Sequence, residues 1–163
     1  MKKVIIIGSP GSGKSTFARK LRDKTNLPLY YLDMIWHKPD QTNISENEFD
    51  AILNDILLKD NWIIDGNYQR TLEKRLKECD TVFLLDFPME ICLSGAESRT
   101  GKKREDLPWT ETEFDSDFRK WITDFPKNQL PDIYRLLENY KNNLIIFHSR
   151  QKTDSYLKIN FPD

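Results

Sequence analysis

Residues 4–16 of the chain read VIIIGSPGSGKST, and this stretch decides the fold. Val4 to Ile7 is a continuous β-branched run, which is typical of a parallel strand buried on both faces. The pattern G-x-x-x-x-G-K-[ST] starts at Gly8, where the run ends. A helix is expected from Gly13 to about Asp23, with apolar side chains four residues apart. A strand, a glycine-rich loop and a helix in this order predict a binding site for nucleotide phosphates.

The residues of this loop have separate expected tasks. Glycines let backbone N–H groups turn inward at a helix N-terminus, whose dipole favours anions. Lys14 adds a positive charge between the β- and γ-phosphates, Ser15 offers its hydroxyl to magnesium, and Thr16 faces the α-phosphate. The alternative is a turn that binds nothing, which would not need three of the six glycines in the chain. We therefore expect ATP and Mg²⁺ to bind at Gly8, Ser9, Pro10, Gly11, Ser12, Gly13, Lys14, Ser15 and Thr16.

Length and charge narrow the remaining possibilities. A chain of 163 residues fits one domain. Lys plus Arg number 25 and Asp plus Glu 26, so no overall field attracts DNA or anionic lipid, and only a local basic patch could bind nucleic acid. The N-terminal apolar run is too short for a signal peptide or a membrane span. The two cysteines lack metal-type spacing and are expected to be reduced, so the expected location is cytoplasmic.

Short apolar runs alternate with longer amphipathic segments along the rest of the chain. This alternation is typical of βα units, and it predicts further strands at 29–32, 62–64, 81–85 and 144–147. Helices are expected from Ser45, over 71–77, from about Glu90, from Thr110 to Pro126, after Pro131 and from about Thr153. Trp62 and Trp121 are expected in the core. The predicted class is α/β, with five parallel strands and helices on both faces of the sheet.

An aspartate follows three of these apolar runs, at the carboxyl ends of expected strands. Ligands bind at that edge of open α/β sheets, so Asp33, Asp65 and Asp86 are all candidates. Asp65 ranks first for the magnesium shell, with Ser15, because its strand leads directly into a glycine turn. Asp33 is the candidate for holding or deprotonating an acceptor hydroxyl. Capping or turn formation is the alternative for both, and Phe-Pro after Asp86 favours a structural turn there.

The chain also contains, in order, the segments GSPGSGKST, YYLDMIWHKP, WIIDGNYQRTLEKRL, TVFLLDFP and FRKWITDF. With these segments it resembles the FlaR-related proteins called DNA topology modulation proteins, which look like members of the adenylate kinase and shikimate kinase group of P-loop kinases. The resemblance spans nearly the whole chain. It implies a three-layer P-loop NTPase fold with strand order 2-3-1-4-5 and a single domain over residues 1–163. It also implies an acceptor-side segment over about residues 33–60 and a short lid over about residues 99–109.

The resemblance further implies roles for basic residues outside the loop. The lid of this kinase group carries arginines that close over the transferring phosphoryl group, and the RTGKKR cluster with Arg99 and Arg104 corresponds to it. The alternative for this cluster is a solvated helix end. Arg150 lies where the adenine-contacting loop of the group falls. The expected catalytic residues are therefore Lys14, Arg99, Arg104 and Asp33.

The acceptor site is expected beside Asp33. The D-G-F-P-R segment of nucleoside monophosphate kinases matches this chain only at its first two residues, and the nearest arginine is Arg70, one place later. That departure argues against a nucleoside monophosphate acceptor. Trp36 follows Asp33 closely enough to stack on a substrate, and Arg119 could reach a phosphate, although it could equally be a surface arginine. The expected acceptor-binding residues are thus Asp33, Trp36, Arg70 and Arg119.

The sequence predicts an ATP-dependent phosphotransferase whose acceptor is a nucleotide, a nucleoside or a hydroxylated metabolite. The competing class is a regulatory or DNA-associated nucleotide-binding protein with ATPase activity, as the name of the resembling proteins suggests. No recognisable DNA-reading motif supports that class. A hydrolysing switch of the GTPase type lacks an evident motif for guanine.

Overall fold

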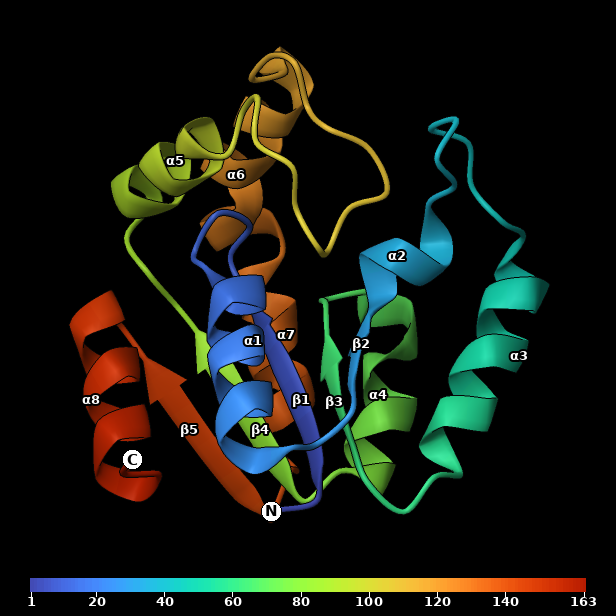
Figure 1. The fold of residues 1–163 in the computed structure, drawn as a ribbon, viewed down its shortest axis with the longest axis vertical. Helices are drawn as coiled ribbons and strands as arrows, with labels where there is room; N and C mark the ends of the chain where they lie inside the picture. Colours follow the sequence, from blue (N-terminus) through green and yellow to red (C-terminus); the bar gives the residue numbers. More distant parts are fainter.

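The computed structural model describes residues 1–163 as a five-stranded sheet with helices packed on both faces (Figure 1). Its strands are β1 (Lys3–Gly8), β2 (Leu29–Tyr31), β3 (Trp62–Asp65), β4 (Thr81–Leu85) and β5 (Asn143–Phe147). They lie in the order β2-β3-β1-β4-β5, and every pairing is parallel. The predicted fold class and strand order are confirmed.

Two layers of helices cover the sheet (Figure 1). One face packs against α1 (Lys14–Thr25), α5 (Met89–Ser98) and α8 (Arg150–Asn160). The other face packs against α3 (Glu46–Leu57), α4 (Gln69–Glu78) and α7 (Leu130–Leu137). The short α2 (Leu32–Trp36) follows β2, and α6 (Ser116–Asn128) contributes side chains to both layers. No helix in the structure combines the length and apolar character needed to cross a bilayer.

Successive side chains of β1 point to opposite faces of the sheet, so the hydrophobic core has two parts. Val4 and Ile6 face the α1 layer, while Ile5 and Ile7 face the α4 layer, and all four are completely buried. Each such side chain stabilises the fold by about 1.5–3 kcal/mol relative to an exposed position. The central strand is therefore rigidly held at the point where it enters the glycine-rich loop.

The loops after the parallel strands gather at one edge of the sheet, as the topology requires. The glycine-rich loop follows β1, and the turn over residues 66–68 follows β3. The segment between α5 and α6, drawn in yellow in Figure 1, hangs over the same edge between α1 and α2. This edge therefore brings together the glycine-rich loop, the turn after β3 and the segment between α5 and α6, which are far apart in sequence.

The helix expected from Thr110 to Pro126 was wrong at both ends. It begins at Ser116, because the Asp115 carboxylate caps it by accepting a hydrogen bond from the Phe118 N–H at 3.0 Å. Residues before the cap are non-helical and line a cleft. Pro126 lies inside the helix, in its last turn, where the missing N–H removes only one hydrogen bond.

Three smaller expectations also need correction. The strand expected over 29–32 ends at Tyr31, and Leu32 begins α2. Helix α8 starts at Arg150, earlier than expected, because the Ser149 side chain caps it. Trp121 was expected in the core, but it is 44% exposed and lines the cleft. Its helix face borders an open cavity there, so amphipathic spacing did not mean burial.

Candidate functional site

The glycine-rich loop after β1 packs tightly on neighbouring backbone. Gly8 has φ +147° and Gly11 has φ +80°, and a Cβ at either position would run into a carbonyl group, of Leu85 or Cys92 respectively. Cys92 lies on α5, so this helix supports the loop from behind. Only glycine fits these positions, and the loop conformation is therefore fixed before any ligand binds.

The N-terminus of α1 faces this loop, and no side chain of the protein accepts hydrogen bonds from its first N–H groups. Gly13 precedes the helix with no side-chain cap, and the first turn carries no acidic residue. The first backbone N–H groups of the helix thus remain available to an anion. Lys14 Nζ reaches back to the Ser9 carbonyl at 3.3 Å, and burial lowers the pKa of Lys14 despite the opposing charge of Asp65. A bound phosphate would offset the cost of burying this ammonium group.

Two loop hydroxyls reinforce the case for a ligand. The Oγ atoms of Ser9 and Ser12 are buried and have no hydrogen-bond partner. Buried polar atoms are rarely left without partners in folded proteins, and such exceptions often mark a missing ligand. The loop therefore has unused donors on its backbone and on its side chains, which suits a polyphosphate.

Asp65 lies at the end of β3, beside β1, and contacts the start of α1. Its Oδ2 accepts a hydrogen bond from Ser15 Oγ at 2.5 Å, while Oδ1 is buried without a partner. Burial raises the pKa of Asp65 to about 6, against the opposing effects of Lys14 and Ser15. A hydroxyl, a carboxylate and phosphate oxygens are the hard oxygen donors that magnesium prefers. The structure contains no group of three or more side chains that would hold a metal alone, and magnesium carried by ATP needs no such group.

Asp65→Asn is expected to stabilise the protein in the absence of nucleotide and metal. Burial raises the pKa of Asp65 from 3.8 to about 6 on folding, so this carboxylate lowers the stability of the fold as the pH rises from about 4 to about 6, and the full loss persists at higher pH. Linkage gives a gain for the variant on the order of 2–3 kcal/mol at about pH 8, which vanishes below about pH 4. Urea unfolding with a chelator present would measure this difference, with the exposed Asp55→Asn as control. Equal stability of Asp65→Asn and the parent protein at the higher pH would contradict the expectation.

The turn that follows Asp65 connects β3 to the phosphate loop and to α2. The Asn67 side chain pairs with Gly8 in both directions, since its Oδ1 accepts from Gly8 N at 2.9 Å and its Nδ2 donates to Gly8 O at 2.8 Å. The Tyr68 hydroxyl donates to Asp33 Oδ1 at 2.7 Å. This turn therefore holds the start of the phosphate loop and orients the carboxylate of Asp33 at the same time.

Arg75 supports this turn from below and is completely buried on α4. Its guanidinium donates to the carbonyls of Gly66, Asn67 and Tyr68, and to the Thr71 hydroxyl. No carboxylate pairs with it, so its charge is spread over carbonyl dipoles. Arg75 is thus a positioning residue for the turn.

Arg75→Met is expected to lower the free energy of unfolding by about 2–5 kcal/mol, because the carbonyls of the turn lose their donors while staying buried. Chemical denaturation would measure the loss, and Lys77→Met on the exposed side of α4 is the matched control. A change no larger than that of the control would show that water replaces the guanidinium without cost.

Two cavities meet at the phosphate loop. The larger has a volume of about 810 Å³ and runs from the loop past Asp33 to α6. The smaller, of about 450 Å³, lies between α1, α5 and the start of α8. Both are lined by Gly11, Ser15, Arg99, Arg104 and Asp106. The end of the phosphate loop is therefore accessible from two sides.

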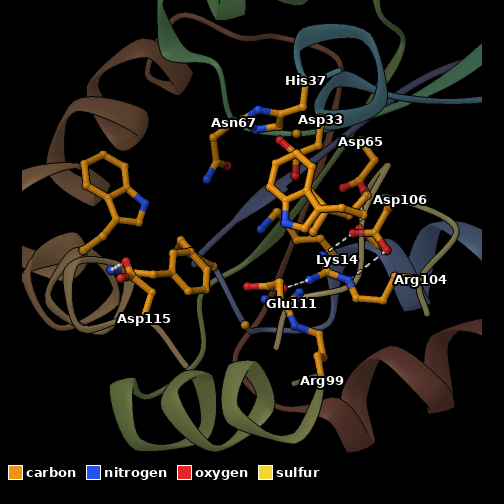
Figure 2. A pocket seen from close by; sticks show the side chains of 18 of the residues that line it. Lys14, Asp33, His37, Asp65, Asn67, Arg99, Arg104, Asp106, Glu111 and Asp115 are labelled. Atoms are coloured by element: carbon orange, nitrogen blue, oxygen red, sulfur yellow. Dashed lines mark hydrogen bonds and ion pairs between the residues drawn. The ribbon is translucent and has the colours of Figure 1, made fainter. Parts of the chain in front are cut away.

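The segment between α5 and α6 supplies two arginines to this junction (Figure 2). Arg104 forms ion pairs with Asp106, at 2.5 Å, and with Glu111. Arg99 has no ion-pair partner, and its Nε is buried without a hydrogen bond. Burial lowers the pKa of Arg99, and the charge of Arg104 lowers it further. Arg99 is thus the available cation of the segment, whereas Arg104 is already paired.

Acidic residues tie the same segment down to α1 and β2. Asp106 is buried and lies 3.6 Å from Arg19 of α1 as well as beside Arg104. Glu105 accepts a hydrogen bond from the Tyr31 hydroxyl at 2.6 Å and pairs with Arg22 at 2.9 Å. The segment is therefore anchored at its middle, and Arg99 and Arg104 lie over the phosphate loop.

Comparisons with known proteins agree with this geometry. No family model matches the chain. Two curated adenylate kinases of Thermotoga neapolitana are 27% identical to it over 88 residues, a match that covers 53% of this chain and only 39% of theirs. The chain thus spans well under half the length of these curated relatives.

Solved structures match over nearly the whole chain. A shikimate kinase from Bacteroides thetaiotaomicron gives a TM-score of 0.61 at 16% identity, over 96% of this chain and 94% of its own. A shikimate kinase from Acinetobacter baumannii in complex with shikimate gives 0.61 at 17%, over 98% and 93%. A gluconokinase from Sinorhizobium meliloti gives 0.59 at 12%, over 98% and 89%. The fold is that of the P-loop kinases. These matches support the resemblance to that group and give no support to the topology modulation name.

The predicted site residues divide into those that meet at the junction and those that do not. Lys14, Ser15, Asp33, Asp65, Arg99 and Arg104 all line the larger cavity, and Arg150 lines the smaller one. The Arg70 guanidinium instead pairs with Asp50 on α3, outside both cavities. Arg119 lies over the Phe114 ring at 4.6 Å, and Trp36 packs against Phe49. The structure therefore does not bring these last three residues to the predicted acceptor site.

Sequence reasoning missed several residues of the larger cavity. Asn67 and Tyr68 follow the matched aspartate and glycine, but their partners Gly8 and Asp33 are too distant in sequence to be guessed from a pattern. Trp109 lies in a stretch without periodicity, and its ring meets that of His37 at 5.1 Å. The one available signal was the density of aromatic and acidic residues over 109–121.

Proposed function

We propose that the protein is an ATP-dependent kinase that phosphorylates a hydroxyl group of a small molecule. The observation that carries this proposal is the meeting of two cavities at the phosphate loop, where Ser15 and Arg99 line both cavities and Lys14 lines the larger one. A hydrolase needs room only for water beside the γ-phosphate, whereas a cavity of about 810 Å³ suits an organic acceptor. The fold shared with shikimate kinases and a gluconokinase is consistent with such chemistry.

The proposed reaction assigns a task to each side of the junction. The loop amides, Lys14 and Arg150 hold ATP in the smaller cavity, and Ser15 with Asp65 would hold magnesium, which neutralises phosphate charge when bound. A bond forms between the acceptor oxygen and the γ-phosphorus while the bond to the bridging β–γ oxygen breaks. ADP leaves with that electron pair, and the hydroxyl proton passes to the Asp33 carboxylate.

The position of Asp33 supports this role. Its carboxylate lines the larger cavity together with Lys14 and Asp65, and Tyr68 fixes one of its oxygens at 2.7 Å. Figure 2 shows Asp33 and Asp65 on the same side of the cavity, with Arg99 and Arg104 across from them. A base on one side and cations on the other suit an in-line transfer, which depends mainly on positioning and charge neutralisation.

A panel assay tests the proposal. Purified protein with magnesium and ATP would be incubated with nucleosides, sugars and amino alcohols, and ADP release and phosphorylated products would be measured by mass spectrometry. Acceptor-dependent product that disappears in Asp33→Asn, with ATP binding retained, is the expected result. ADP release that no acceptor increases would count against a kinase. Tight duplex binding with steep salt dependence would then favour the DNA-associated alternative.

The basic run over residues 99–104 fits a kinase better than a DNA-associated protein. Within the basic run, Arg99 and Arg104 line both cavities, and the exposed Lys102 and Lys103 lie at the edge of the smaller one. Two lysines are a small footprint for a duplex. Cys79 and Cys92 are both buried and free, which supports a reducing compartment, and we include a cytoplasmic location in the proposal.

A further inference from the structure

The larger cavity has a distinct wall beyond the phosphate loop. Residues 107–121, which comprise the loop before α6 and the first half of that helix, form most of it and contribute aromatic and acidic side chains. The rings are those of Trp109, Phe118 and Trp121, and the carboxylates are those of Glu111, which pairs with Arg104, and of Glu113 and Asp115. Asp33 faces the same space from α2. We call residues 107–121 the acceptor wall.

The charges around this cavity are unevenly distributed. All its lysine and arginine residues lie at the phosphate loop, namely Lys14, Arg99 and Arg104. ATP would occupy the first two, and Asp106 and Glu111 already neutralise Arg104. No arginine or lysine pairs with Asp33, Glu113 or Asp115. The part of the cavity left for an acceptor therefore carries two exposed carboxylates, those of Glu113 and Asp115, and neither forms an ion pair.

A second observation shows that this cavity favours positive charge. Asp65, at its inner end, is only 5% exposed, and its Oδ1 has no hydrogen-bond partner. A buried carboxylate oxygen without a donor attracts a cation or a hydrogen-bond donor. Magnesium would account for that oxygen on the nucleotide side, but it leaves Glu113 and Asp115 of the acceptor wall without an ion-pair partner.

The aromatic rings of the acceptor wall also favour a positively charged ligand. Aromatic faces attract ammonium groups, most strongly those of tryptophan, and the acceptor wall contributes two tryptophans. Asp115 lies on this side of the cavity, well away from Lys14 and Arg104 (Figure 2). Carboxylates beside aromatic faces recognise a substituted amine better than a phosphate or a carboxylate.

We propose that the acceptor is a hydroxylated amine, of the size of an amino sugar or an amino alcohol, whose ammonium group lies between Asp115, Glu113 and the rings of the acceptor wall. This inference rests on the proposed kinase function. It also accounts for the placement of Arg70 and Arg119, the arginines expected to bind an anionic acceptor, outside the cavity.

A series of compounds of equal size tests whether the acceptor is positively charged, neutral or negatively charged. Glucosamine, glucose and gluconate, and likewise an amino alcohol, a diol and a hydroxy acid of equal length, would be compared in the presence of magnesium. Calorimetry with a non-hydrolysable ATP analogue measures binding, and ADP release with ATP measures turnover. The amine of each set is expected to bind at least about tenfold more tightly than the neutral compound, with the acid weakest.

A double variant tests the assigned carboxylates. Glu113→Gln with Asp115→Asn removes both charges, and asparagine can still cap α6. We expect the dissociation constant of the amine to rise about tenfold or more, while ATP affinity, measured without acceptor, stays the same. Asp117→Asn with Glu90→Gln, two exposed acids outside the cavity, is the matched control and should leave amine affinity unchanged.

The two readouts distinguish the inference from the kinase proposal. Turnover of neutral or acidic acceptors in preference to amines would overturn the inference and leave the kinase intact. Failure of every amine to bind would also overturn it. Amine binding that the double variant weakens, without any turnover, would support the recognition site and count against phosphoryl transfer.

Discussion

Lys14→Ala is expected to reduce kcat by about 10²–10³-fold and to weaken ATP binding at least about tenfold. The Lys14 ammonium is the charge that completes the phosphate loop, and its Nζ reaches only the Ser9 carbonyl at 3.3 Å in the absence of ligand. No other lysine lines the larger cavity. Calorimetry with ATP and magnesium would measure the affinity, and steady-state assays with an identified acceptor would measure turnover.

The stability of this variant serves as its internal control. Burial lowers the pKa of Lys14, so its charge destabilises the fold without a bound anion, and alanine should not weaken the fold. Lys24→Ala, at the far end of α1 and paired with Asp163, should leave ATP affinity unchanged. Undiminished ATP binding in Lys14→Ala would place the phosphate site elsewhere, and the proposed function would fall with it.

Arg99→Ala is expected to lower kcat by about 10³-fold while ATP affinity changes far less, because a cation that contacts the transferring group stabilises mainly the transition state. Arg99 is suited to this task since it lines both cavities and has no ion-pair partner. Arg104 is held by Asp106 and Glu111, so Arg104→Ala should cost less turnover than Arg99→Ala.

Separate measurements of ATP binding and of kcat would check that Arg99→Ala loses more turnover than Arg104→Ala. Arg99→Lys should recover part of kcat, since it keeps the charge but loses the planar fork of the guanidinium. Arg135→Ala, an exposed arginine on α7 paired with Asp132, is the control. An Arg104→Ala variant more impaired than Arg99→Ala would show that the lid rearranges on binding and releases Arg104 from its carboxylates.

Much of the fold was predictable because its signals are local. The buried run Val4 to Ile7, the phosphate-loop pattern and the apolar runs of the other strands each follow from a few adjacent residues. Because connections between parallel strands are right-handed, the order of strands and helices along the chain is compatible with only a few sheet topologies. The aspartates at strand ends were predictable for the same reason, and Asp65 does contact Ser15.

The resemblance placed a lid with Arg99 and Arg104 over about residues 99–109, but the contacts that anchor it, and the acceptor wall, were not predictable because they join residues distant in sequence. Glu105 lies 74 residues from its partner Tyr31, and no periodicity marks that pairing. Arg70 illustrates a second difficulty. Tyr68 has a left-handed backbone with φ +36°, which redirects the chain before α4, so the Arg70 side chain faces Asp50 on α3. Arg70, which lies one position later than the arginine of the D-G-F-P-R segment, therefore contacts α3 and not the cavity.

The acceptor wall lies outside the sheet and in a single continuous stretch of chain, residues 107–121, whereas the phosphate loop and Asp65 follow the central strands β1 and β3. If the protein is the kinase we propose, most of its acceptor contacts therefore come from one short stretch, while its nucleotide contacts come from the ends of the central strands. Replacing the residues between Asp106 and Ile122 is then expected to change the preferred acceptor and to leave the strands and ATP binding intact.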